Sequence, residues 1–128
     1  SIRRQRQMCI RDSARHRRSE CVRADAVDEG LRLARARRWF DAHEAFEDAW
    51  RVATGPRRAL MRALVHACVA LEHQRRGNAA GVALQVPKAR ARLAEAAPDD
   101  PLTGVARAWI EAVVALDPRS PEDAWPVP

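Results

Sequence analysis

Residues 40–50, FDAHEAFEDAW, contain a histidine, four carboxylates, two phenylalanines and a tryptophan. In a helix, His43 and Glu47 are four residues apart and Trp50 follows three residues later, so all three side chains project from one face. Glu44 and Asp48 point away from that face and are expected to contact solvent. The segment therefore predicts a helix that carries a polar constellation of His43, Glu47 and Trp50.

A metal site is the first chemistry that this spacing allows. His43 and Glu47 would be neighbouring ligands, and the next helix could supply His66 or His73, which are seven residues apart and share a stripe. In a metal-dependent hydrolase of this kind, Glu44 would be available as the general base. The segment HEAFE resembles only half of the HExxH zinc motif, because Glu47 stands where the second histidine would be. A divalent metal is thus a possible cofactor, and none is certain.

Three other roles suit the same side chains. General acid–base chemistry would need Glu47 to be partly desolvated or paired with a histidine. In a small-molecule site, His43, Glu47 and Trp50 would line a polar groove between two helices together with His73. In a structural role, a buried and hydrogen-bonded His/Glu pair would fix the register of two helices with Trp50 packed above it. We favour the structural role, then the small-molecule site, and only then the metal site.

The elements that must position these side chains are helices. Apolar residues recur at spacings of three and four, and Gly- and Pro-containing breaks separate them. Pro87 is expected to kink the fourth helix near Leu84. Short connections make consecutive helices antiparallel, so the fold class is all-α, a compact bundle of about five short antiparallel helices. Their approximate ranges are 25–36, 39–53, 56–76, 78–97 and 102–116.

The composition supports a single helical domain. The 128 residues are 47% hydrophobic and only 5% aromatic, which favours closely packed helices over sheets. No apolar run approaches the roughly 20 residues that span a bilayer, and no secretory leader is recognised. The cysteines Cys9, Cys21 and Cys68 lack the spacing of a zinc site or a disulfide framework. These features predict a cytoplasmic protein without a membrane partner.

The net charge of +6 is confined to one segment. Residues 1–23 contain eight arginines against Asp12 and Glu20, so the rest of the chain is neutral. Nucleic-acid binding is therefore expected only of this segment, and we consider it unlikely for the domain. The run MCIRDS at residues 8–13 is also what results when a common transposon-end sequencing adapter is translated in frame.

These observations divide the chain into three parts. Residues 1–23 are expected to be a disordered basic tail that is not native, because the apolar periodicity is missing and the adapter-like run lies within it. Residues 24–117 form the helical domain. Residues 118–128 form a proline-rich C-terminal tail that cannot continue as a helix. The oligomeric state is left open.

The motif resembles a known family. His43, Glu47 and Trp50 fit the HxxxExxW motif of the bacterial, archaeal and plant helical family called domain-of-unknown-function family 309. The resemblance covers about residues 28–93, and Pro87 departs from the family's usually uninterrupted fourth helix. Further positions agree with the family pattern: Gly30, Leu33, Ala42, Glu44, His73, Gly77, Asn78 and Gly81. The resemblance implies a compact all-helical domain of unsettled function, and some family members carry a metal-dependent hydrolase label.

Other residues offer weaker alternatives. Cys68 lies on an Ala- and Val-rich helix without an evident base and is expected to be a small buried hydrophobe. Arginines in the third helix could form an anion-binding patch, although a solvated face is the simpler interpretation. If the polar constellation is buried, the domain could instead be a protein-interaction module that uses an apolar patch around Trp109 or Trp125. The arginines concerned are Arg57, Arg58 and Arg62.

Overall fold

The computed structural model describes residues 15–116, and the side chains of residues 25–116. The described residues form helices and no strands, which confirms the predicted all-α bundle. Predictions for residues 1–14 and 117–128, including the adapter-like run and Trp125, lie outside the described residues. The helices are α2 (Arg15–Arg35), α3 (Trp39–Val52), α4 (Gly55–Arg75), α5 (Ala79–Leu93) and α6 (Pro101–Ala115).

Local sequence explains where the later helices begin. Pro56 occupies the first turn of α4, where its missing N–H costs nothing. The Asn78 side chain caps α5 by accepting a hydrogen bond from the Gly81 backbone N–H at 3.0 Å. Asp100 caps α6 in the same way, by accepting from Leu102 N–H at 3.0 Å. These caps place the helix starts within a few residues of the predicted ones.

The first helix differs most from its prediction. The helix α2 begins at Arg15, ten residues before the predicted start at residue 25. Residues 15–23 of the predicted disordered tail therefore have a helical backbone. The reason lies in the local sequence, because residues 15–29 contain neither glycine nor proline and are rich in arginine and alanine, which are good helix formers.

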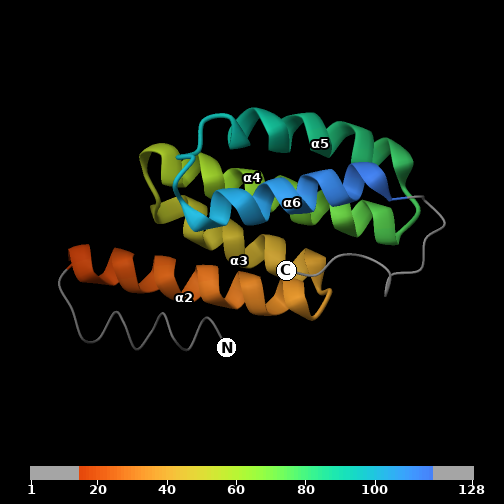
Figure 1. The fold of residues 1–128 in the computed structure, drawn as a ribbon. Helices are drawn as coiled ribbons and strands as arrows, with labels where there is room; N and C mark the ends of the chain where they lie inside the picture. The colour runs from red at the N-terminus through yellow and green to blue at the C-terminus, as the bar shows by residue number, and fades with distance from the viewer. Residues whose placement is uncertain (1–14, 117–128) are drawn as a thin grey trace.

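The helix α4 is the centre of the bundle. It packs against α3, α5 and α6, whereas α2 packs on the outer side of α3 (Figure 1). Buried aromatic rings join α3 to α6: the Trp109 ring lies 6.0 Å from that of Trp39 and 6.0 Å from that of Phe46. All three side chains are buried. The core thus occupies the space between α3, α4 and α6.

Two small features shape the outer helices. Gly30 lets α2 approach α3 closely, because a Cβ atom there would lie 2.7 Å from the Phe46 ring. The helix α5 runs from Ala79 to Leu93 with Pro87 inside it, and three of its residues are buried. Among the described helices, none is long and apolar enough to cross a membrane.

Candidate functional site

The HxxxExxW residues lie at the edge of the α3 surface that packs in the core. The core side of α3 is made of Trp39, Ala42, Ala45, Phe46 and Ala49. His43, Glu47 and Trp50 are each half-buried, and Glu44 is exposed as predicted. The motif is therefore not sealed inside the bundle, and its side chains face both protein and solvent.

The connection between α3 and α4 has only two residues, Ala53 and Thr54, and it fixes the register of the hairpin. Next to the connection, the Trp50 ring lies under the guanidinium groups of Arg58 and Arg62, whose central carbons are 4.1 Å and 4.9 Å from the ring centroid. One turn earlier on α3, Glu47 forms an ion pair with Arg62 at 3.7 Å. The two helices are thus antiparallel, and residues earlier in α3 lie beside residues later in α4.

This register separates the residues that sequence analysis grouped together. His66 lies one turn after Arg62, on the level of His43. His73 is seven residues further along α4, or about 10 Å at 1.5 Å per residue. Its neighbour Glu72 borders the same pocket as Trp39 and Phe40, in the first turn of α3. The structure therefore does not bring His43, Glu47 and His73 into one site.

The three histidines have separate local partners. Nδ1 of His43 contacts the backbone oxygen of Phe40 in its own helix, and the Phe40 ring packs edge-on at 4.7 Å. Nδ1 of His66 lies 2.8 Å from Oε1 of Gln85 on α5. Burial lowers the pKa of His66, the hydrogen bond to Gln85 opposes this shift, and three nearby cations lower the pKa further. These cations are Arg62, Lys88 and Arg92.

His73 belongs to a tightly packed corner between α4 and α5, which we call the His73 corner: His73, Gly77, Asn78 and Gly81. Asn78 Nδ2 lies 3.2 Å from His73 Nδ1 and donates to it when that nitrogen is unprotonated, while Asn78 Oδ1 caps α5. Gly77 has φ of 71°, a left-handed conformation that suits glycine at a helix end. A Cβ atom on Gly81 would collide with the His73 ring. The four residues thus form a structural turn.

The metal-site hypothesis receives no geometric support. Within residues 25–116, no group of three or more His, Cys, Asp or Glu side chains is arranged to hold a metal ion. The proposed ligands are divided because Glu47 pairs with Arg62, His66 with Gln85 and His73 with Asn78.

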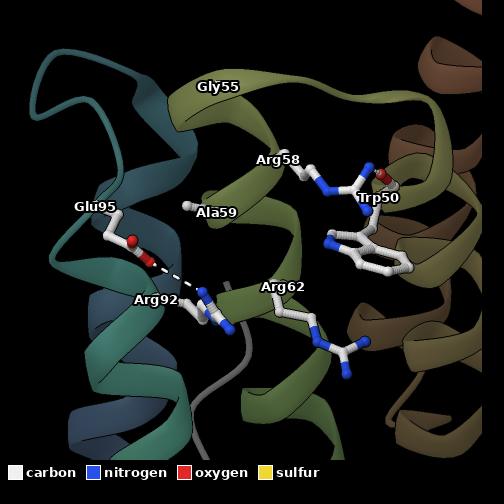
Figure 2. Close-up of a pocket in the computed structure, with 7 residues that line it drawn as sticks. All are labelled: Trp50, Gly55, Arg58, Ala59, Arg62, Arg92 and Glu95. Carbon is white, nitrogen blue, oxygen red and sulfur yellow. Dashed lines mark hydrogen bonds and ion pairs between the residues drawn. The ribbon is translucent and has the colours of Figure 1, made fainter.

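A pocket of about 320 Å³ lies beside the motif, which we call the Trp50 pocket (Figure 2). It is open to solvent on the side of the α3–α4 hairpin where α5 ends. Trp50 is the residue of the HxxxExxW motif that lines it. Its other lining residues come from α4 and from the end of α5: Gly55, Arg58, Ala59, Arg62, Arg92 and Glu95.

Some residues of this pocket were predicted from the sequence and others were not. Trp50, Arg58 and Arg62 were predicted as candidate site residues, but in two unrelated groups. Arg92 and Glu95, which follow Arg62 by about 30 residues, were not predicted. Only the two-residue connection could have linked Trp50 to Arg58 beforehand, because so short a turn places the last turn of one helix beside the first turn of the next.

The remaining candidates are structural. Cys68 is fully buried, as predicted, and burial strongly raises the pKa of its thiol, so it is a poor nucleophile. Trp109 is also buried and cannot form the exposed apolar patch considered above. Arg57 forms a half-buried ion pair with the α6 cap residue Asp100 at 2.6 Å and so ties α4 to the start of α6.

Comparison with known proteins gives one match. The family model described as a domain of unknown function (DUF309) matches residues 27–84, a stretch that contains α3, α4 and the His73 corner. No curated protein and no solved structure matches the chain.

Proposed function

We propose that this domain binds a small molecule in the Trp50 pocket. The description of the DUF309 family, whose model matches residues 27–84, states no activity, so the proposal is argued from the geometry of the pocket. The observation that carries the proposal is the position of Trp50. It is a half-buried aromatic side chain on the wall of a pocket, whereas Trp39 and Trp109 are buried in the core. Aromatic side chains beside a few convergent polar groups are typical of ligand sites.

The arrangement of the motif supports the proposal. Glu47 holds Arg62, and Arg62 together with Arg58 covers the Trp50 ring. The side chains of Glu47 and Arg62 are each about one-third exposed, so their ion pair contributes little to stability. We infer that these residues position the pocket wall rather than hold the fold together. The structural role favoured by sequence analysis suits His73 and Asn78 better than Glu47 and Trp50.

A binding screen tests the proposal. Thermal melting of the protein would be followed with a library of small metabolites. Ala59→Met places a longer side chain in the Trp50 pocket, and Ala108→Met makes the same change at an exposed position on α6. A ligand of this pocket should raise the melting temperature of the wild type and of Ala108→Met, and fail to do so for Ala59→Met. Equal shifts for all three proteins would contradict the proposal.

A further inference from the structure

The polar groups that line the Trp50 pocket are almost all hydrogen-bond donors. Arg58, Arg62 and Arg92 are permanently charged donors without an acceptor atom, and the Trp50 indole N–H is a donor only. In Figure 2 the nitrogen edge of the Trp50 ring is turned toward the side of the pocket where Ala59 lies. Glu95 is the one carboxylate in the lining, and it pairs with Arg92 at 3.2 Å.

The arginines keep donors available. Arg58 uses only Nη1 for its long contacts with the backbone oxygens of Trp50, at 3.4 Å, and Ala53, at 3.5 Å. Stacking on Trp50 holds the plane of the guanidinium without using its N–H groups. The five N–H groups of a guanidinium form a fork that matches a carboxylate or a phosphate. Arg58 is therefore held in place with most of its donors unused by these contacts.

The charge of the pocket is not fully balanced. The pairs of Arg62 with Glu47 and of Arg92 with Glu95 are partly exposed, and exposed pairs are weak. Within residues 25–116, no carboxylate forms an ion pair with Arg58 at 4.0 Å or less. Burial is the main cause of the lowered pKa of His66, and the positive charges of Arg62, Lys88 and Arg92 lower it further.

The first turn of α4 adds to the positive charge of the pocket. Gly55, the first residue of α4, lines the pocket, and no side chain caps the helix at Thr54. The exposed N–H groups at a helix start carry a partial positive charge that favours anions. This contribution supplements the arginines, which supply the full charges.

We propose that the ligand of the Trp50 pocket is a small oxyanion, a carboxylate or a phosphate, held by Arg58, Arg62 and Arg92 with the Trp50 indole N–H. The inference rests on the proposed small-molecule function and specifies its chemistry. The volume of about 320 Å³ suits an organic acid or a phosphate monoester.

Isothermal titration calorimetry at constant ionic strength tests this inference, with inorganic phosphate, succinate and uncharged glycerol as probes. Phosphate, succinate or both should bind saturably, and glycerol should not. Arg58→Gln and Arg92→Gln should each weaken binding by about tenfold or more, because each removes a charge-assisted hydrogen bond. Arg90→Gln is the matched control, since Arg90 is an exposed residue of α5 that does not line the pocket, and it should leave affinity unchanged.

Each outcome has a definite meaning. Binding of phosphate alone identifies a phosphate site, and binding of succinate alone identifies a carboxylate site; either supports the inference. Equal weakening by Arg90→Gln would indicate general attraction to positive charge and overturn it. If uncharged metabolites bind and are blocked by Ala59→Met while both anions fail, the small-molecule function stands and the oxyanion inference fails. If no compound binds in either experiment, both proposals fail.

Discussion

The two ends of the α3–α4 hairpin differ in how their polar residues are used. At the Trp50 pocket, the charged groups are partly exposed, the ion pair of Glu47 with Arg62 spans 3.7 Å, and space remains beside them. At the other end, Glu72 is buried and accepts hydrogen bonds from Arg75 and Arg76, while the His73 corner has no room for a methyl group at Gly81. A pocket of about 400 Å³ also borders Glu72, so both ends offer space. The ends differ in their polar groups: the Glu72 carboxylate is already occupied by two arginines, whereas the donors of Arg58 at the Trp50 pocket make only long backbone contacts.

The largest effect is expected at the His73 corner. Gly81→Ala should lower the free energy of unfolding by about 3 kcal/mol, the upper part of the range for overpacking, because the new methyl group meets the His73 ring. Chemical denaturation measures the loss. Adding His73→Ala should recover part of it by removing the ring.

Gly104→Ala is the control for this substitution. Gly104 lies within α6, and a Cβ atom there would meet nothing within 4 Å. Alanine should therefore stabilise the protein by about 0.5–1 kcal/mol, because glycine is the poorer helix former. If Gly81→Ala and Gly104→Ala change the free energy of unfolding equally, Gly81 does not pack closely on His73.

The second effect concerns Glu72 at the same end of the hairpin. Glu72→Gln should cost about 2 kcal/mol at pH 7, since the carboxylate accepts charge-assisted hydrogen bonds from two arginines. Glu47→Gln is the matched substitution at the Trp50 pocket. If Glu72→Gln lowers the free energy of unfolding less than Glu47→Gln does, the Trp50 end and not the Glu72 end stabilises the fold.

The contribution of Glu72 should also depend on pH. The hydrogen bond from Arg75 is the main cause that holds the pKa of Glu72 below its ordinary value of 4.5. A depressed folded pKa means that the stabilisation is present above the unfolded pKa and is lost as the pH falls through the folded value. The difference in unfolding free energy between wild type and Glu72→Gln should therefore shrink between pH 6 and pH 3. A constant difference would argue against the ion pairs.

A smaller effect is expected from Asn78→Ala, which removes the cap of α5 and the contact with His73. The loss should be about 1 kcal/mol, the usual cost of an N-cap. Asn78→Asp, which keeps the capping oxygen, should retain most of the stability in the same denaturation experiment. Equal losses for both variants would mean that capping is not the cause.

The smallest effect is expected at the pocket itself. Glu47→Gln should change the free energy of unfolding by no more than about 0.5 kcal/mol, because the pair with Arg62 is long and one-third exposed. A loss above about 2 kcal/mol, as for a buried charge pair, would assign Glu47 to the fold rather than to a ligand site.

Sequence patterns predicted the helices well and the site only in part. Trp109 and Val113 are four residues apart and are both buried on one face of α6, although Trp109 was also considered for an exposed patch. The motif spacing placed His43, Glu47 and Trp50 along one side of α3. Both depend on the helical repeat alone. The pairing of Glu47 with Arg62 instead of a histidine depends on register between helices, which the two-residue connection determines. Arg92 could not be found, since its position depends on how α5 packs against α4.

The early start of α2 teaches a similar lesson. Disorder was predicted for residues 1–23 because apolar periodicity is missing there, yet the arginines of residues 15–23 are good helix formers. With no glycine or proline before Gly30, the helix of residues 25–35 continues backward to Arg15. Missing apolar periodicity alone therefore did not locate the start of the helix.

The most direct test of the account is an NMR titration that follows the indole N–H signals. Phosphate and succinate would be added to ¹⁵N-labelled protein, and the Trp50 signal would be assigned with Trp50→Phe. Trp39 and Trp109 are internal controls, because their indole nitrogens are buried and have no hydrogen-bond partner among the described residues. The account predicts that the Trp50 signal shifts saturably while the signals of Trp39 and Trp109 stay in place. An unchanged Trp50 signal, or equal shifts of the Trp39, Trp50 and Trp109 signals, would contradict a ligand site at this end of the hairpin.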